Sequence, residues 1–249
     1  MTTPRRFDGR RALVTGGSRG IGEGIARRLA AEGAHVIVAG RSLGPAQEVA
    51  GEIGGSAVQM DISDAEATMA AVAALGPLDV LVNNAGFDDF AYFTDTAPQQ
   101  WRALLGTNLE GMFACTHAAL PAMQQAGYGR ILNIGSEAGR IGSKGNAVYA
   151  TTKAGIIGFS KSIARENARY GITCNTLAVG PIDTPLTDAA RAVPVHGEKM
   201  VQAMKDGTLL RRLGTTEEVG AAAAFLCAEE ASFVTAECLG VSGGMGISA

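Results

Sequence analysis

Short runs of apolar and β-branched residues alternate along the chain with longer Ala-rich segments whose apolar positions recur at helical spacing. The short runs predict strands near residues 11–15, 34–39, 56–60, 78–82, 130–135, 172–178 and 238–241. The longer segments predict helices near residues 21–32, 44–52, 65–74, 98–126, 147–169 and 216–228. Strands that alternate with helices form parallel sheets. We therefore predict an α/β fold, a doubly wound sheet of seven parallel strands with helices on both faces.

The segment near residues 181–213 is the one long stretch without a clear period, and it is rich in proline. Ligands of parallel sheets bind beyond the carboxyl ends of the strands, and long irregular segments there are often functional. We expect this segment to be a lid. The 249 residues fit a single domain, 1–249, better than two small ones. Thr215 and Glu218 form a candidate capping box at the start of the last predicted helix.

Composition excludes several classes of protein. Hydrophobic residues make up 47% of the chain and charged residues 18%, which is enough apolar material for a sizeable core. The net charge of −3 leaves no excess of cations for a nucleic acid, so we expect no such partner. No apolar run approaches the ~18 residues of a membrane span, and no secretory leader is recognisable. We expect a soluble cytoplasmic protein.

Cysteine and histidine residues are scattered rather than paired. The four cysteines lie in apolar segments without a C-x-x-C motif and are expected to be buried, reduced thiols; they are Cys115, Cys174, Cys227 and Cys238. The three histidines are His35, His117 and His196, and His35 is expected to pack beside a strand. We assign no metal site. The absence of a G-x-S-x-G elbow disfavours a serine hydrolase.

A glycine-rich turn follows the first predicted strand and opens a helix. Glycines at this position permit a tight turn and let a pyrophosphate approach the free amides of the helix N-terminus. An ordinary glycine-rich turn is the alternative, but the position after a first strand favours a dinucleotide. The residues expected to hold it are Gly16, Ser18, Arg19, Gly20, Ile21 and Gly22.

Further motifs follow in order. They are Asn83-Asn84-Ala85-Gly86 after the fourth strand, Asn108 inside a predicted helix, Ser136 after the fifth strand, and Tyr149-Ala150-Thr151-Thr152-Lys153. Together with the G-x-x-x-G-x-G spacing of the turn, they resemble the short-chain dehydrogenase/reductase family from about residue 9 to residue 244. The resemblance implies a Rossmann-type fold and an NAD(P)-dependent interconversion of a secondary alcohol and a ketone.

The end of the second strand bears on the choice of nucleotide. A free ribose diol is best met by a carboxylate there, whereas a 2′-phosphate needs cations. The strand ends in Gly40-Arg41-Ser42 without an acid, and Arg41 with Arg19 would form the charge-assisted fork that a phosphate prefers. We favour NADP(H), with NAD(H) as the alternative, because an arginine at this position can also be a solvated surface charge or stack on adenine.

Tyr149 and Lys153 are four residues apart and therefore project from the same face of a helix, one turn apart. A phenol with its ordinary pKa of ~10 is a poor base at neutral pH, and a nearby ammonium favours the phenolate. We expect Lys153 to lower the pKa of Tyr149. Separately, Ser136, Asn108 and these two residues could each be structural, but behind a nucleotide loop they predict a proton-transfer site.

The family resemblance implies a role for each of these residues. Tyr149 would exchange the proton of the alcohol or carbonyl oxygen, Ser136 would hold that oxygen, and Lys153 would also grip the nicotinamide ribose. Asn108 would hold a proton-relay water. The other implied cofactor contacts are Asp61 and Ile62 at the adenine, Asn83, Ala85 and Gly86 toward the nicotinamide ribose, and Gly180, Ile182 and Thr184 near the carboxamide.

One motif departs from the family. Where the family usually reads Pro-Gly before the lid, this chain reads Val179-Gly180-Pro181. Proline removes an amide and fixes φ, so we expect the backbone beside the carboxamide to differ.

The expected substrate pocket lies between the loop after Gly86, the segment after Ser136 and the lid. Its candidate residues are Phe87, Tyr92, Phe93, Ile141, Val193 and His196. A mostly apolar lining fits a hydrophobic or alicyclic alcohol or ketone better than a sugar, although some of these side chains could belong to the core.

Within the family, the stretches NNAGFDDFAYF, VGPIDTPL and SFVTAECLGVSGG are most similar to 2-hydroxycyclohexanecarboxyl-CoA dehydrogenases. Those relatives generally pair with NAD, in conflict with the Gly40-Arg41 ending. The 3-oxoacyl-carrier-protein reductases are the other comparison, with Lys144, Arg211 and Arg212 as possible contacts to an acyl carrier's phosphates or as plain surface charge. A nucleotide-sensing protein without catalysis is an alternative of another class. The resemblance also implies a homotetramer that pairs the helices near 98–126 and 147–169, with a second interface at the C-terminal strand.

Overall fold

The structure, a computed structural model, describes residues 5–185, 187, 191 and 197–248. Seven parallel strands form one sheet in the order β3-β2-β1-β4-β5-β6-β7. The strands are β1 (Arg11–Thr15), β2 (His35–Gly40), β3 (Ser56–Gln59), β4 (Val80–Asn83), β5 (Gly129–Ser136), β6 (Ile172–Val179) and β7 (Cys238–Val241). The predicted single α/β domain with a seven-stranded parallel sheet is confirmed.

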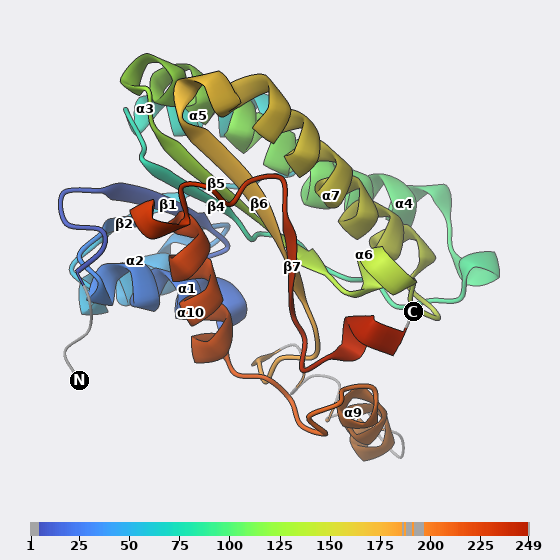
Figure 1. Cartoon of the computed structure of the whole chain (residues 1–249). Helices are drawn as coiled ribbons and strands as arrows, with labels where there is room; N and C mark the ends of the chain where they lie inside the picture. The colour runs from blue at the N-terminus through green and yellow to red at the C-terminus, as the bar shows by residue number, and fades with distance from the viewer. Residues whose placement is uncertain (1–4, 186, 188–190, 192–196, 249) are drawn as a thin grey trace.

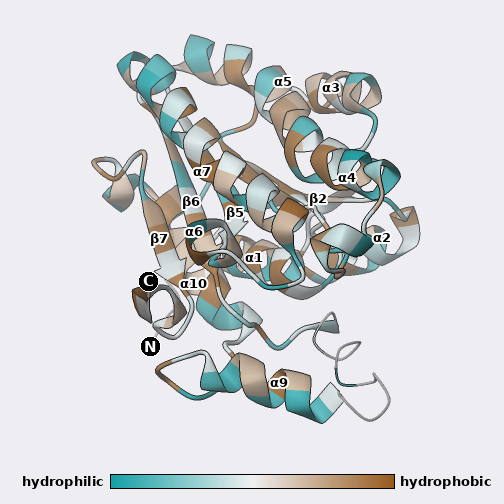
Figure 2. Ribbon diagram, turned by 90° about the vertical axis from the view of Figure 1, so that its right-hand side faces the viewer, coloured by the Kyte–Doolittle hydropathy of each residue, from teal (hydrophilic) through white to brown (hydrophobic). Residues whose placement is uncertain are grey.

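Helices cover both faces of the sheet (Figure 1). One face carries α1 (Gly20–Ala31), α2 (Leu43–Glu52) and α10 (Thr216–Cys227). The other carries α3 (Ala65–Ala74), α4 (Pro98–Leu105), α5 (Gly111–Ala126) and α7 (Ala147–Asn167). Shorter elements are α6 (Ala138–Ile141) and the 3₁₀ turns η1 (Phe93–Asp95), η3 (Ala168–Tyr170), η4 (Glu229–Ala231) and η5 (Met245–Ser248). The remaining helix, α9 (Gly197–Asp206), stands apart from the body of the domain (Figure 2).

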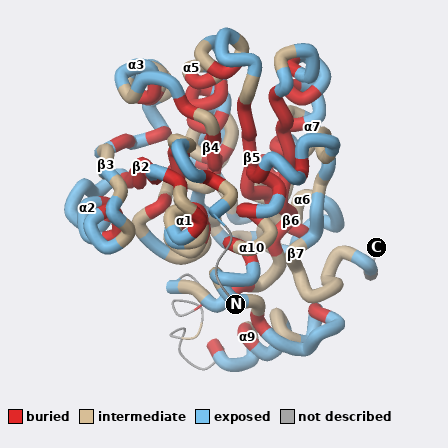
Figure 3. Tube along the Cα trace, turned by 60° about the vertical axis from the view of Figure 1, so that its left-hand side comes forward, coloured by how far each residue is buried: buried red, intermediate tan, exposed pale blue. Residues whose placement is uncertain are grey.

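The sheet is buried on both faces, as a parallel sheet must be when helices cross over on each side. Along β1, Ala12 and Val14 face the core beneath α1 and α10, whereas Leu13 faces the core beneath α5. This alternation follows from the two-residue period of a strand. The central strands are accordingly buried along their length, and exposed positions gather on the outer surfaces of the helices (Figure 3). The strand pairing therefore fixes the positions of the carboxyl ends of the strands, where the loops that follow them begin.

Two sequence predictions need correction. The helix predicted over residues 98–126 is divided, because a π turn, η2 (Gly106–Glu110), separates α4 from α5. The segment predicted to be irregular over 181–213 contains α9 and a parallel bridge from Ile182 to Gly214. The sequence does not reveal this helix because α9 has only 10 residues and follows a stretch that contains three prolines, Pro181, Pro185 and Pro194.

Other expectations from the sequence can be compared directly with the structure. The capping box before α10 is confirmed: the N–H of Glu218 donates to Thr215 Oγ1 (3.2 Å), and the N–H of Thr215 donates to Glu218 Oε2 (2.9 Å). Cys115, Cys174 and Cys227 are free and buried, and burial raises the pKa of each thiol to about 12. Within the described ranges, no helix combines the length and the hydropathy that crossing a membrane requires.

Candidate active site

The glycine turn between β1 and α1 is closely packed. Gly16 and Gly20 adopt φ of +62° and +56°, the left-handed region that glycine enters without strain. A Cβ at Gly22 would lie 2.2 Å from the carbonyl oxygen of Gly16, so no side chain fits there. Ile21 packs against the core beneath this turn. The turn therefore presents the amino end of α1 to the space above the sheet, as a pyrophosphate site requires.

Asn84, at the end of β4, ties that strand to the glycine turn. Its Nδ2 donates to the carbonyl oxygens of Thr15 (2.9 Å) and Gly16 (3.1 Å). Thr15 Oγ1 in turn accepts from the N–H groups of Asn84 (3.0 Å) and Ala85 (3.1 Å). These bonds fix the shape of the turn. Asn84 and Thr15 were not among the predicted site residues, although both belong to motifs visible in the sequence.

Asn83, by contrast, turns its side chain inward. Its Nδ2 donates to Asn133 Oδ1 (2.8 Å) and Thr116 Oγ1 (3.1 Å), and the residue is buried. Asn133 Nδ2 continues this interior network to Ser160 Oγ (2.8 Å). Any contact of Asn83 with a cofactor would therefore come from its main chain, whereas the resemblance implied a residue that lines the passage.

The end of β2 lies beside the glycine turn. A Cβ at Gly40 would lie 3.2 Å from Ser18 Oγ, which places the two loops side by side. Arg19 and Arg41 are both exposed, and neither forms an ion pair with another described residue. Ser42 is the N-cap position of α2. Two exposed cations thus border the end of the second strand, and neither is in an ion pair with a residue of the described ranges.

Asp61 and Ile62 follow β3 on the adenine side of the predicted site. Asp61 Oδ1 accepts from the N–H (3.1 Å) and the Oγ (2.8 Å) of Ser63, and these bonds lower the pKa of Asp61, with a smaller contribution from the charge of Arg41. Ile62 is buried against Gly111 of α5. Asp61 is therefore an exposed carboxylate near Arg41, and the next residue, Ile62, anchors this segment in the core.

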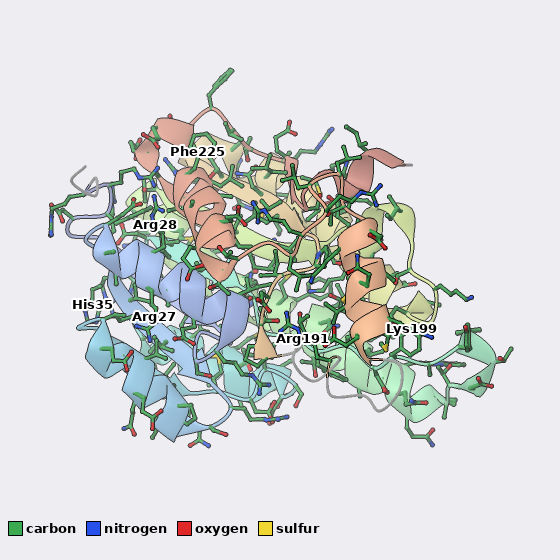
Figure 4. All side chains as sticks on the ribbon, turned by 90° about the horizontal axis from the view of Figure 1, so that it is seen from below. Arg27, Arg28, His35, Arg191, Lys199 and Phe225 are labelled. Carbon is green, nitrogen blue, oxygen red and sulfur yellow. The ribbon has the colours of Figure 1, made fainter. Side chains whose placement is uncertain are left out.

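The first residues of the predicted lid lie against the glycine turn. The N–H of Gly180 donates to Val241 (3.0 Å), which fixes the ends of β6 and β7 together. Thr184 comes within contact of Gly20, since its Cβ lies 3.7 Å from the position of a Cβ at Gly20. A groove of about 490 Å³ follows this contact between α1, α10 and residues 183–185, bordered on α1 by Arg27 and Arg28 (Figure 4).

Ile182 sits in a parallel bridge with Gly214 that orients its peptide groups. The bridge uses the carbonyl oxygen of Pro181, which accepts from Gly214 (3.0 Å), and the N–H of Asp183, which donates to Gly214 (2.9 Å). In such a bridge the N–H of the central residue points away from the paired strand. The N–H of Ile182 is therefore directed away from Gly214, although Pro181 follows Gly180 here instead of preceding it as in the family.

Three polar side chains meet where β5 ends and α7 begins. Ser136 ends β5, and its hydroxyl, which accepts from the N–H of Ala138 (3.2 Å), lies close enough to the Tyr149 phenol to lower the pKa of that phenol. Lys153 is buried one turn further along α7, with Nζ 5.5 Å from the centre of the Tyr149 ring. That ammonium donates to the carbonyl oxygen of Ile134 (2.9 Å). The helical spacing thus brings Tyr149 and Lys153 together as the sequence predicted, with Ser136 beside them.

The pKa values of this pair run against the sequence prediction. Burial and, to a smaller extent, the negative charge of Asp88 raise the pKa of Tyr149, the Ser136 hydroxyl lowers it, and the net pKa is about 12. Burial also lowers the pKa of Lys153 to about 8. The predicted lowering of the Tyr149 pKa is therefore wrong for this structure, because burial and the charge of Asp88 raise this pKa. The Lys153 ammonium donates to the Ile134 carbonyl of β5 and does not contribute to the shift. Tyr149 is a protonated phenol at neutral pH.

Asn108 lies in the π turn η2 and holds the loop after β4. Its Oδ1 accepts from the N–H of Phe87 (3.0 Å), and its Nδ2 donates to the Phe87 carbonyl (2.9 Å) and to Thr152 Oγ1 (3.3 Å). A Cβ at Gly86 would lie 2.9 Å from Asn108 Oδ1 and 3.8 Å from Lys153 Nζ. Since its side chain is fully engaged, the main chain of Asn108 is left for the implied water. π turns of this kind are frequent at functional sites.

The predicted substrate residues surround the entrance only in part. Large apolar side chains are exposed there: Phe87, Tyr92, Phe93 and Ile141. Phe93 stacks on Trp101 with ring centres 5.4 Å apart and shares a small cavity with Asn146 and Tyr149. Val193 and His196 lie outside the described residues.

Histidine and acidic residues do not gather into a metal centre in the described part of the chain. His35 begins β2, is exposed rather than packed, and has Nε2 3.2 Å from Ser56 Oγ. It lies far from Arg191 and from Lys199 of α9 (Figure 4).

Comparisons with known proteins agree with this geometry. A family model described as Enoyl-(Acyl carrier protein) reductase matches residues 16–246. The chain is 39% identical over 249 residues to 3-oxoacyl-[acyl-carrier-protein] reductase FabG of Escherichia coli, covering 96% of this chain and 98% of that protein. It is 40% identical over 241 residues to acetoacetyl-CoA reductase of Shinella zoogloeoides, covering 94% and 97%.

Solved structures give the same result. A 3-oxoacyl-[acyl-carrier protein] reductase of Brucella melitensis superposes with a TM-score of 0.91 at 34% identity, covering 98% of this chain and 94% of that one. The aldohexose dehydrogenase of Thermoplasma acidophilum superposes with a TM-score of 0.89 at 33% identity, covering 98% and 97%. The chain therefore belongs to the short-chain dehydrogenase/reductase family and is a ketoreductase or dehydrogenase that acts on a CH–OH group with NAD(P).

Proposed function

We propose that the chain is an NADP(H)-dependent reductase that converts a ketone of an acyl thioester into the secondary alcohol. The observation that carries this proposal is that Ser136, Tyr149 and Lys153 lie together at the carboxyl end of β5. The glycine turn follows β1 at the same edge of the sheet, and β4 lies between these two strands. Two relatives whose names specify 3-oxoacyl and acetoacetyl thioesters, each about as similar as the other, support the thioester class.

The residues around the glycine turn and the carboxyl end of β5 fit a dinucleotide. The glycine turn leaves no room for a side chain at Gly22, and Gly20 lies in contact distance of Thr184. The pyrophosphate would bind the amides at the start of α1, and the N–H of Ile182 would meet the carboxamide. Lys153 would hold the nicotinamide ribose near Gly86. When bound, the nicotinamide supplies the hydride.

The side chains of the site supply the proton and the orientation. Tyr149 is protonated at neutral pH and donates its phenolic proton to the carbonyl oxygen, on which negative charge develops as the carbon is reduced. Ser136 holds that oxygen within reach of the phenol. The Lys153 ammonium stabilises the phenolate that results, which is where its charge has the largest effect.

Replacing Arg41 by Asp tests the choice of nucleotide. The guanidinium would bind the 2′-phosphate of NADPH, and a carboxylate there would repel it and favour the ribose diol of NADH. We expect the ratio of kcat/KM for NADPH to that for NADH to fall by at least about tenfold, the worth of one charge-assisted hydrogen bond.

The matched control is Arg102→Asp, which makes the same change of charge on an exposed residue of α4. This variant should keep the nucleotide preference of the unmodified chain. An unchanged ratio in Arg41→Asp would contradict the assignment of the phosphate site to Arg41.

A panel of substrates tests the thioester class. NADPH oxidation would be followed with 3-oxoacyl thioesters of CoA, with the alicyclic 2-oxocyclohexanecarboxyl-CoA, and with the corresponding free keto acids. The exposed aromatic residues Phe87, Tyr92 and Phe93 favour the alicyclic thioester as the second candidate. We expect the free acids to be poor substrates; equal rates with acids and thioesters would contradict the proposal. Tight NADPH binding with no oxidation by any ketone would favour the nucleotide-sensing alternative.

We also infer that the chain works as a homotetramer with a lid. Apolar side chains are exposed at Phe113 of α5, Phe225 of α10 and Leu239 of β7. The ring centre of Phe113 lies 4.6 Å from that of the partly buried Phe159 of α7. Pairing of these surfaces would bury them. Light scattering after gel filtration should give the mass of four chains.

The segment 181–213 would close over the ligand, since its first residues already contact the glycine turn.

A further inference from the structure

Asp88 connects the loop after β4 to the first turn of the helix that carries Tyr149. Asn146 Nδ2 donates to Asp88 Oδ2 (2.6 Å). Asn146 immediately precedes α7, and its carbonyl accepts the first helical bond, from Ala150 (2.7 Å). A second link, from the N–H of Ala91 to the Gly145 carbonyl (2.9 Å), runs parallel to the first. The Asp88 carboxyl is therefore held at the start of α7, by the residue three positions before Tyr149.

Asp88 Oδ1 and Asn146 Oδ1 are both buried, and neither accepts a hydrogen bond from a side chain of the described residues. The main chain of Asp89 also acts on the Asp88 carboxyl and lowers its pKa. A buried carboxylate costs free energy unless donors or an opposite charge compensate it. Because the surroundings are buried, the charge of Asp88 acts on neighbouring groups with little screening.

The charged and titratable groups that face this carboxyl are few. Lys153 and Tyr149 act on it from α7, and Asp89 acts from its own loop. From β5 come the Ser136 hydroxyl and the Ile134 carbonyl, which contact the other two members of the group. Asp88 lies two residues beyond Gly86. A Cβ added at Gly86 would lie 3.8 Å from Lys153 Nζ, so this loop passes close to the ammonium.

We propose that Asp88, positioned by Asn146, is the counter-charge that keeps both Lys153 and Tyr149 protonated, so that the site rests as a proton donor. A buried negative charge favours the ammonium over the amine and the phenol over the phenolate. The electrostatic effects act in this sense: the charge of Asp88 raises the pKa of Tyr149 and opposes the lowering of the Lys153 pKa by burial. Burial raises the pKa of Asp88, and the main chain of Asp89, the amide of Asn146 and the charge of Lys153 oppose that rise, in this order of effect. The part of the proposal that concerns proton donation rests on the proposed function.

The test measures the ionisation of Lys153 directly, without turnover. The ¹⁵N resonance of its Nζ, assigned by its loss in Lys153→Met, would be followed from pH 6 to pH 10, a range that brackets the pKa of about 8. In Asp88→Asn the midpoint should fall by about one unit, the effect of one nearby charge. Asp89→Asn is the matched control, because Asp89 is the adjacent carboxylate and instead accepts from Gln100 (2.8 Å). It should leave the midpoint in place, and Asp88→Glu should restore it in part.

The outcomes separate this proposal from the proposed function. An unchanged Lys153 midpoint in Asp88→Asn overturns the counter-charge, whether or not the chain reduces ketones. A lowered midpoint without ketone reduction upholds the counter-charge and rejects the reductase. Should Asp88→Asn fail to fold, the unmodified chain decides: the side-chain carboxyl ¹³C resonance of Asp88 must show an inflection at the pH where Lys153 titrates, and its absence overturns the proposal.

Discussion

Replacing Tyr149 by Phe is expected to lower the rate of ketone reduction by about 100-fold to 10,000-fold, the worth of a positioned acid or base. The substitution removes one hydroxyl from a ring that α7 holds beside Ser136 and Lys153, so the fold and the nucleotide crevice should persist. Single-turnover reduction and the dissociation constant of NADPH, measured by fluorescence, would be compared between the two proteins. The rate should collapse while the dissociation constant stays within about twofold.

Tyr170→Phe provides the matched control for this variant. It removes the same hydroxyl from a tyrosine of η3, where the phenol accepts from Arg169 Nη2 (2.8 Å) on the surface. Its turnover should equal that of the unmodified chain. A Tyr149→Phe protein that turns over at more than about a tenth of the original rate would remove the phenol from the reaction.

Gly22→Ala is expected to abolish tight nucleotide binding. The added methyl group would lie 2.2 Å from the Gly16 carbonyl and 2.4 Å from Asn84 Nδ2, the two groups that fix the glycine turn. Main-chain atoms cannot yield without opening the turn, so we expect a loss of about 1–3 kcal/mol in the free energy of unfolding. The dissociation constant of NADPH should rise by more than about tenfold, because the amides at the start of α1 move with the turn.

Gly51→Ala is the control for the added methyl group. Gly51 lies near the end of α2 with nothing within 4 Å of the new Cβ, so alanine should leave binding unchanged and raise stability by up to about 1 kcal/mol. Equal NADPH affinity in Gly22→Ala and the unmodified chain, measured by calorimetry, would show that the turn does not hold the nucleotide.

The sheet could be predicted from the sequence because its signals are local. Each strand is a short apolar run, and the turn at Gly16 to Gly22 follows the first of them directly. The π turn at Asn108 could not be predicted, since the hydrogen bonds of Asn108 to Phe87 and Thr152 join residues distant in the sequence. A continuous helical period runs through that turn without a break that a sequence pattern would reveal.

The candidate site divides in the same way. The four-residue spacing of Tyr149 and Lys153 fixes their common face, because both lie on one helix. The pKa of Tyr149 depends on burial and on Asp88, a residue on another loop, and neither is visible in the spacing. The inward turn of Asn83 likewise depends on Asn133 of the neighbouring strand. Long-range contacts, rather than motifs, decide the electrostatics.

Transfer of isotope tests the central claim most directly. NADPH carrying deuterium at both positions of C4 of the nicotinamide would be incubated with a 3-oxoacyl-CoA thioester, and the product analysed by mass spectrometry and NMR. The account predicts one deuterium on the new carbinol carbon, on a single face, with the hydroxyl proton drawn from solvent by way of Tyr149. A chain that binds NADPH yet leaves the deuterium on the nucleotide with every ketone thioester would contradict it.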